Sequence, residues 1–174
     1  MNNPLQYFTS IKAFVFDVDG VLTNGDLIIL PNAVMARTMN VKDGYALQLA
    51  VKKGYPVAII SGGNSKEVIE RLKILGIQDI FMNISDKAAA LKEFQTIHQL
   101  NANEILFMGD DLPDLEVMQM VGLPCCPKDA VDEIKEISKY ISLYIGGKGC
   151  ARDVIEKVLK LANKWQHTNH VSSK

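Results

Sequence analysis

Five aspartates lie in two short polar segments, each of which directly follows a run of apolar residues. Residues 17–23 read Asp-Val-Asp-Gly-Val-Leu-Thr, and residues 109–114 read Gly-Asp-Asp-Leu-Pro-Asp. If both apolar runs are parallel strands of one sheet, their carboxyl ends meet at the same edge and bring the carboxylates together. The repulsion among them would be costly without a cation. A magnesium ion (Mg²⁺) fits this set, because it binds one or two carboxylates, waters and a substrate phosphate.

Ser61, two glycines and Lys87 supply a complementary anion site. Ser61 ends an apolar run and precedes Gly62 and Gly63 at a predicted helix N-terminus. A hydroxyl and free backbone N–H groups in that position can bind phosphate oxygens, and Lys87 adds a positive charge. Together with the carboxylates, these residues suit phosphoryl transfer, in which a carboxylate can act as the nucleophile and form an aspartyl-phosphate.

The polar segments are positioned by short apolar runs that alternate with amphipathic helical patterns. Strands are expected at residues 13–16, 56–60, 80–82, 105–108 and 140–145, and helices at 43–53, 64–75, 86–100 and 152–165. Strands alternating with helices of about 10 to 15 residues indicate right-handed crossovers. The predicted fold class is therefore α/β, a three-layer, doubly wound, mostly parallel sheet with helices on both faces.

One segment, at about residues 24–40, interrupts this alternation. The apolar residues 27–30 and the largely apolar segment 34–39 flank Pro31 and Asn32, a pattern that predicts a β-hairpin projecting from the first connection. Its apolar content is high for an exposed flap, so we expect another subunit to cover part of it. No linker divides the chain, so we predict a single domain over residues 1–166, followed by a flexible tail at 167–174.

Composition excludes several classes of protein. With 174 residues, 48% of them hydrophobic and 22% charged, the chain fits one globular domain rather than a disordered protein. A net charge of −1 offers no broad basic field for a nucleic acid or an anionic membrane. Neither a signal peptide nor a membrane span is recognisable. Cys125, Cys126 and Cys150 lack a complete disulfide framework and zinc spacing, which favours a reducing, cytoplasmic location.

Each motif by itself also has a common structural interpretation. Asp-x-Asp-Gly occurs in turns and calcium loops, Ser61 could cap a helix, and Lys87 could be a solvated surface lysine. The joint occurrence of all these segments at predicted strand and helix ends favours the functional interpretation.

Four parts of the chain resemble, in order and content, the four motifs of the haloacid dehalogenase (HAD) superfamily of phosphatases. They are residues 17–23, Ser61, Lys87 and residues 109–114. The resemblance implies that Asp17 is the nucleophile that attacks phosphorus. It implies that Asp19 is the general acid for the leaving alcohol and then the general base for water. Ser61 and Lys87 would hold the phosphoryl group.

The same resemblance implies a magnesium site and its supporting residues. Asp17, Asp110 and the backbone carbonyl of Asp19 would be the metal ligands. Asp111 and Asp114 would support the metal and Lys87.

Other segments resemble the 3-deoxy-D-manno-octulosonate 8-phosphate (KDO 8-phosphate) phosphatase family, over roughly residues 10 to 163. They are residues 41–44, 61–65, Arg71 with 75–77, 109–114, 122–124, 127–130, 146–149 and 151–152. The resemblance implies a cytoplasmic, capless homotetramer that hydrolyses a sugar-acid phosphate in KDO and lipopolysaccharide biosynthesis. In that family the hairpins form a central barrel, and the glycine-rich segment 146–149 closes over a neighbour's active site. The short spacing from the first motif to Ser61 also leaves no room for a cap domain.

Five residues are candidates for binding the substrate beyond its phosphoryl group: Gly62, Gly63, Arg71, Lys148 and Arg152. Lys148 and Arg152 would suit the carboxylate of a sugar acid, with flexible glycines permitting closure. Many family members carry Arg at the position of Gly63, and relatives that act on nine-carbon sugar acids carry Glu. The eight-carbon 8-phosphate is therefore the first substrate hypothesis, and the 9-phosphate of a nine-carbon 2-keto-3-deoxy sugar acid is the alternative.

Two hypotheses come from other classes of protein. A receiver-like phosphoacceptor domain places its acidic pair after the first strand and its acceptor Asp after a middle strand. Here the segment Asp17-x-Asp19-Gly20, which contains the candidate acceptor, comes after the first strand. A catalytically silent HAD-fold scaffold would keep the fold for assembly alone, although all four motifs are intact.

Overall fold

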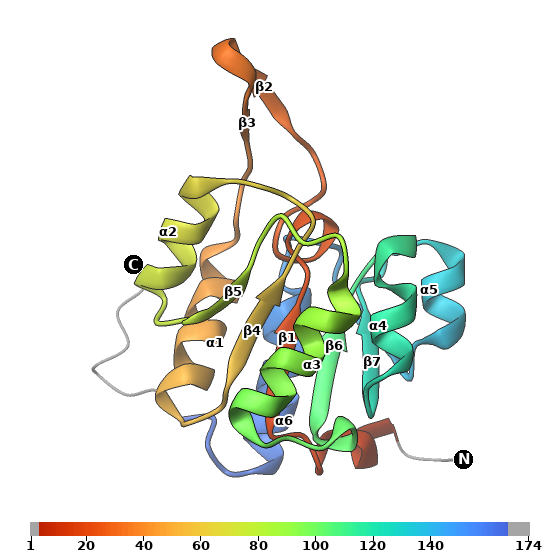
Figure 1. Ribbon diagram of the computed structural model, residues 1–174. Helices are drawn as coiled ribbons and strands as arrows, with labels where there is room; N and C mark the ends of the chain where they lie inside the picture. The colour runs from red at the N-terminus through yellow and green to blue at the C-terminus, as the bar shows by residue number, and fades with distance from the viewer. Residues whose placement is uncertain (1–3, 167–174) are drawn as a thin grey trace.

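The computed structural model describes residues 4–166, so the tail predicted at 167–174 lies outside the described residues. A six-stranded sheet has the order β5-β4-β1-β6-β7-β8, and its neighbouring strands all pair in parallel. The strands are β1 (Ala13–Phe16), β4 (Val57–Ile60), β5 (Asp79–Phe81), β6 (Ile105–Met108), β7 (Leu123–Cys126) and β8 (Tyr140–Ile141). β1 lies inside the sheet between β4 and β6 (Figure 1).

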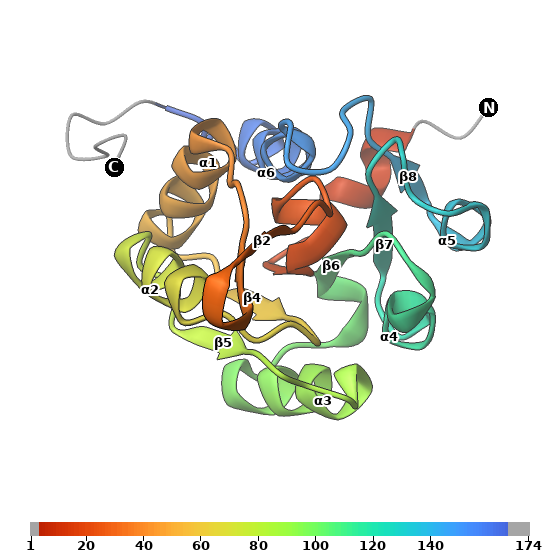
Figure 2. The same ribbon diagram turned by 90° about the horizontal axis from the view of Figure 1, so that it is seen from above.

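Two layers of helices cover the sheet, one on each face (Figure 2). One layer contains α1 (Val41–Lys52), α2 (Lys66–Ile74) and α6 (Cys150–Leu161), and the other contains α3 (Lys87–His98), α4 (Leu115–Gln119) and α5 (Asp132–Ile137). Successive residues of a strand point to opposite faces. Phe14 and Phe16 accordingly join the first core, whereas Ala13 and Val15 join the second. The predicted three-layer α/β fold is confirmed.

Three elements were not predicted from the sequence. β7 contains Pro124, a residue that normally argues against an interior strand. The helices α4 and α5 have five and six residues, too few to show a clear apolar period. The strand expected over 140–145 is limited to Tyr140–Ile141.

The segment that interrupts the alternation is a β-hairpin, as predicted. β2 (Ile28–Leu30) pairs antiparallel with β3 (Val34–Ala36), and the hairpin extends away from the sheet (Figure 1). Its turn places Asn32 at φ 63° and Ala33 at φ 58°. The described residues contain no cap domain, and none of their helices is long and apolar enough to cross a membrane.

Removal of the Phe94 ring should show how strongly α3 is held on the sheet. Phe94 is 0% exposed, whereas Ile97 on the same helix is 56% exposed. We expect Phe94→Ala to lower the free energy of unfolding by about 3–5 kcal/mol, because it leaves a cavity in the core. Ile97→Ala should change it by about 0.5 kcal/mol or less. Denaturant titration measures both, and equal losses would contradict this packing.

Candidate active site

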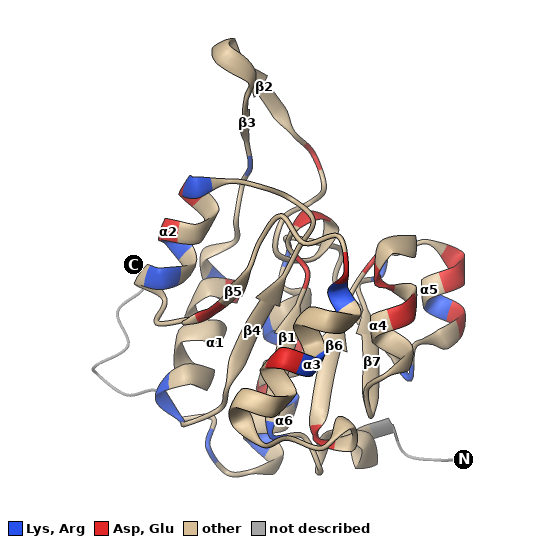
Figure 3. Ribbon diagram, in the orientation of Figure 1, with Lys and Arg blue, Asp and Glu red and all other residues tan. Residues whose placement is uncertain are grey.

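The carboxyl ends of β1, β4 and β6 meet the start of α3 at one edge of the sheet. Asp17 follows β1, Ser61 follows β4, Asp110 lies just after β6, and Lys87 begins α3. The backbone N–H of Asp17 donates to the carbonyl of Met108 (3.1 Å) and so joins the end of β1 to the end of β6. Figure 3 shows acidic segments grouped near this edge, next to a basic segment at the start of α3.

Most of the predicted site residues line one cavity of about 420 Å³. It is lined by Asp17, Asp19, Ser61, Gly62, Gly63, Lys87, Asp110, Asp111 and Asp114, among others. The sequence prediction that these segments converge is therefore confirmed by the geometry of the fold. The chemical roles assigned to the individual residues remain predictions.

Two glycines allow the carboxylates to come this close. Gly20 has φ 86°, and a Cβ added to it would lie 1.9 Å from Asp110 Oδ2. A Cβ on Gly109 would lie 2.5 Å from the Cβ of Asp114. A side chain at Gly20 would push the two acidic loops apart, and one at Gly109 would displace Asp114 within its own loop.

Lys87 links two of the carboxylates. Its Nζ lies 3.2 Å from Asp17 Oδ2 and 2.7 Å from Asp114 Oδ1. The other oxygen of Asp114 accepts a hydrogen bond from the backbone N–H of Asp110 (3.2 Å). Burial opposes the charged ammonium, but the two carboxylates outweigh it and raise the pKa of Lys87. Asp114 thus positions Lys87 and Asp110, in keeping with its predicted supporting role.

The carboxylates of Asp17, Asp110 and Asp114 fit a divalent cation. Each offers an oxygen within 4.8 Å of the others. Asp17 Oδ1 and Asp110 Oδ1 are buried and have no hydrogen-bond partner among the described residues. Since both oxygens of Asp114 are already bound, Asp17 and Asp110 are the side chains available for Mg²⁺.

The pKa values of these carboxyls show that burial, together with neighbouring negative charge, disfavours their ionised forms. Burial, with repulsion from Asp114, raises the pKa of Asp17 to about 6. Burial, with repulsion from Asp17 and Asp114, raises the pKa of Asp110 to about 8. A bound cation would favour the ionised forms and remove this cost.

The anion side of the cavity is formed by Ser61 and Lys87, both of which are buried. The Ser61 hydroxyl accepts a hydrogen bond from the N–H of Gly63 (3.2 Å). The residue that caps α2 is Ser65, whose hydroxyl accepts from the N–H of Val68 (3.3 Å). The alternative interpretations of Ser61 as a helix cap and of Lys87 as a solvated lysine are therefore wrong.

The sequence prediction missed Arg37, which follows β3 at the base of the hairpin. Its Nε donates to Asp19 Oδ1 (2.6 Å), and its Nη2 donates to Asp19 Oδ2 (2.9 Å). Both side-chain oxygens of Asp19 are paired in this way, and its backbone carbonyl remains the group predicted as a metal ligand. The available signal was that Arg37 is the only basic residue within 24–40.

Three predicted residues line other cavities, and Asp111, which does line the cavity of about 420 Å³, uses its carboxylate in a local turn. Asp111 caps the turn that follows it, accepting a hydrogen bond from the N–H of Leu112 (2.8 Å). Arg71 lines a neighbouring cavity of about 370 Å³. Lys148 and Arg152 line a separate cavity of about 480 Å³, where Arg152 Nε donates to Glu156 (3.2 Å). Within one chain, the two candidates for carboxylate binding do not reach the catalytic cavity.

The glycine-rich segment packs on the first motif of its own chain. A Cβ on Gly146 would lie 2.0 Å from the carbonyl oxygen of Gly20. The N–H of Gly147 donates to the carbonyl of Val21 (2.9 Å). Asp43, buried in α1, accepts from the N–H groups of Gly149 (3.0 Å) and Arg152 (2.7 Å) and thereby holds the start of α6.

Comparison with known proteins identifies the class. The family of haloacid dehalogenase-like hydrolases matches residues 76–152, which include Lys87 and the acidic segment at 109–114. Together with the sheet order and the convergent site, this match defines the protein as a HAD-like hydrolase.

Several relatives narrow the class further. The 3-deoxy-D-manno-octulosonate 8-phosphate phosphatase of Yersinia pestis is 30% identical over 168 residues, covering 97% of this chain and 90% of the relative. The phosphatase of the same name from Escherichia coli K12 is 32% identical over 155 residues, covering 89% of this chain and 82% of the relative. The crystal structure of the Moraxella catarrhalis phosphatase, in complex with magnesium ion, phosphate ion and KDO, has a TM-score of 0.90 and 33% identity, covering 95% of each chain. This chain belongs to the 3-deoxy-D-manno-octulosonate 8-phosphate phosphatase family.

The acidic cluster predicts a specific pH dependence of stability. The carboxyls of Asp17 and Asp110 titrate near 3.8 when unfolded, but near 6 and near 8 in the fold without metal. The folded state then holds protons that the unfolded state has lost, so stability should fall as pH rises from about 4 to about 8. We expect Mg²⁺ to raise the Tm most at the upper end of this range, as measured by thermal unfolding with and without chelator.

Asp110→Asn provides the control for this experiment. It removes the carboxyl with the highest pKa of the pair, so both the decline of Tm with pH and the response to Mg²⁺ should shrink. A Tm at pH 8 that is the same with Mg²⁺ and with chelator would contradict a metal site in this cluster.

Proposed function

We propose that this protein is a magnesium-dependent phosphomonoesterase that hydrolyses 3-deoxy-D-manno-octulosonate 8-phosphate to the free sugar acid and phosphate. The observation that carries the proposal is one cavity lined by Asp17, Asp110, Ser61 and Lys87, in which Asp17 and Asp110 each have a buried oxygen without a partner among the described residues. The names of the relatives support this activity, and the Moraxella catarrhalis structure holds magnesium, phosphate and KDO. We infer that the reaction takes place in the cytoplasm and that the product enters lipopolysaccharide or another glycan.

In the proposed mechanism Asp17 attacks the phosphorus atom. A bond forms between its carboxylate oxygen and phosphorus while the ester P–O bond breaks, and Asp19 donates a proton to the leaving oxygen. Water then attacks the aspartyl-phosphate, Asp19 takes a proton from that water, and Asp17 is released together with phosphate. Ser61 and Lys87 hold the phosphoryl oxygens throughout.

The proposed metal ligands are Asp17, Asp110 and the backbone carbonyl of Asp19. A bound Mg²⁺ would offset the negative charge of the carboxylates and of the phosphoryl group. The hydrogen bonds of Asp114 orient both Asp110 and Lys87 for these tasks.

The substrate beyond its phosphoryl group is proposed to contact Gly62, Gly63 and Arg71. Lys148 and Arg152 line a separate cavity, so their proposed contact with a sugar acid would be made in the active site of a neighbouring subunit. The exposed apolar residues of the hairpin support such a homotetramer, since a flap of this kind is usually covered. They are Leu27, Ile28, Ile29, Leu30, Val34 and Met35.

A second candidate substrate is the 9-phosphate of a nine-carbon 2-keto-3-deoxy sugar acid. Gly63 has no side chain, and a Cβ added to it would lie 3.1 Å from Asp19 Oδ2. The position at which other family members carry Arg or Glu therefore has no side chain here to favour one acid length.

The experiment that tests the function is phosphate release from matched eight-carbon and nine-carbon 3-deoxy-2-ketoacid phosphates and from simple hexose phosphates. We expect activity with Mg²⁺, none with chelator, and a kcat/KM for the eight-carbon ester that is about tenfold higher or more. Comparable turnover of the other esters would keep the mechanism and overturn the substrate assignment.

Asp17→Asn tests the chemistry independently of the substrate. Loss of the nucleophile should lower kcat by roughly a thousandfold or more. Asp132→Asn, an exposed carboxylate on α5, is the matched control and should keep wild-type activity. Wild-type protein without phosphatase activity would instead support the scaffold or receiver-like hypothesis.

The proposed homotetramer can be tested by light scattering coupled to size exclusion. The mass should be about four times the 19.3 kDa of the chain. Ile29→Glu, at a hairpin residue that is 77% exposed, should shift the protein to smaller species, because a buried carboxylate would be unpaired. Ile97→Glu on α3 should leave the mass unchanged. A wild-type monomer would overturn the role of a neighbouring subunit.

A further inference from the structure

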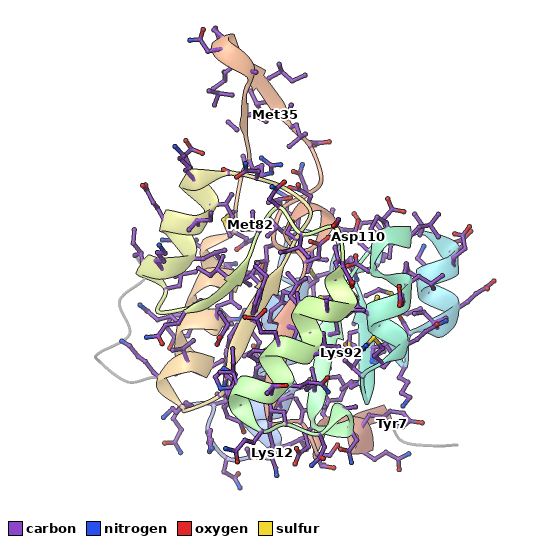
Figure 4. The ribbon with its side chains drawn as sticks, in the orientation of Figure 1. Tyr7, Lys12, Met35, Met82, Lys92 and Asp110 are labelled. Atoms are coloured by element: carbon purple, nitrogen blue, oxygen red, sulfur yellow. The ribbon has the colours of Figure 1, made fainter. Side chains whose placement is uncertain are left out.

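Arg37 lies between two cavities at the base of the hairpin. It lines the cavity of about 370 Å³ that also contains Arg71, and its guanidinium binds Asp19, which lines the catalytic cavity. A Cβ on Gly63 would lie 3.4 Å from Arg37 Nη2. In Figure 4 the hairpin, labelled at Met35, rises from the edge of the sheet where Asp110 is labelled.

We propose that Arg37 is a specificity-determining residue that binds the carboxylate of the substrate in exchange for Asp19. The proposal rests on the proposed function, in which the substrate is the phosphate ester of a sugar acid. The two hydrogen bonds from Nε and Nη2 to Asp19 match the planar geometry with which arginine recognises a carboxylate. A carboxylate of the substrate can take the same two donors.

The burial of the two partners indicates which of them moves. The Arg37 side chain is 7% exposed, and its Nη1 also donates to the carbonyl of Met35 (3.0 Å). The Asp19 side chain is 34% exposed. Exchange therefore displaces Asp19 and leaves Arg37 in place. Replacing one carboxylate by another also keeps the buried guanidinium paired, which avoids the cost of an isolated buried charge.

The other basic residues near the site do not already account for binding of the substrate carboxylate. Among the described residues that line the two cavities, the basic ones are Lys87, Arg37 and Arg71. Lys87 is bound by Asp17 and Asp114. Lys148 and Arg152 line a different cavity of this chain, so they can bind a carboxylate in this site only when a neighbouring subunit supplies them. Arg37 is the one that already binds a carboxylate in the arginine fork geometry.

The exchange couples recognition to chemistry. A substrate with a carboxylate releases the Asp19 side chain, which can then turn toward the leaving oxygen. A phosphate ester without a carboxylate leaves Asp19 bound to Arg37, away from that task. Such an ester should therefore lose kcat as well as affinity, because the interaction with Arg37 contributes to the transition state.

The test compares two esters on each protein, the eight-carbon 8-phosphate and its analogue with a carboxamide in place of the carboxylate. Wild type should favour the carboxylate in kcat/KM by about 10- to 100-fold, the usual range for a charged hydrogen-bonded pair, with part of the difference in kcat. Arg37→Gln should reduce the preference to about threefold or less, and Arg37→Lys should fall between. Lys66→Gln, which removes an exposed charge nearby on α2, should retain the wild-type preference.

The readout is the ratio of the two rates. Partial misfolding of a variant lowers both rates by the same factor and leaves their ratio unchanged. A wild-type preference that persists in Arg37→Gln overturns the role of Arg37 and leaves the proposed function standing. Wild type that hydrolyses both esters equally overturns the sugar-acid substrate and the role of Arg37 together.

Discussion

The site depends on one constraint, which is that several carboxylates are held closer together than their charges favour. Lys87 compensates part of this repulsion by binding Asp17 and Asp114. The remaining buried oxygens of Asp17 and Asp110 have no partner in the described chain, and the pKa of each carboxyl is raised. A cation and a phosphoryl group together would stabilise this arrangement, because the cation neutralises the carboxylates and allows the anionic phosphoryl group to bind.

The sheet provides the rigidity that this crowding requires. β1, β4 and β6 are buried on both faces, and their ends are joined by hydrogen bonds such as that from Asp17 to Met108. Gly20 then allows Asp110 of the opposite loop to approach, and Gly109 allows Asp114 of its own loop to approach, where any Cβ would collide. Strain from electrostatic repulsion is thus opposed by two packed cores rather than by the loops alone.

Outside the cluster, tertiary contacts connect distant segments to the first motif. Arg37 ties the hairpin to Asp19, and the glycine-rich segment packs on Gly20 while Asp43 holds the start of α6. The contacts of Arg37 and of the glycine-rich segment act on the short loop after β1, which carries the proposed nucleophile and general acid. The hairpin in this family member therefore has a direct electrostatic contact with the loop after β1, in addition to its exposed apolar surface.

The sequence by itself determined the parts of the molecule that follow from local pattern. Apolar runs that end in Asp17, Ser61 and before Asp110 were enough to predict convergence, because parallel strands share one carboxyl edge. The proline in β7 and the shortness of α4 and α5 concealed those elements from any periodicity. Only the tertiary structure decided that Arg37 binds Asp19 and that Lys148 and Arg152 line another cavity. Periodicity reports which face of an element is buried, whereas these placements depend on how a hairpin and a loop fold back over residues far away in the chain.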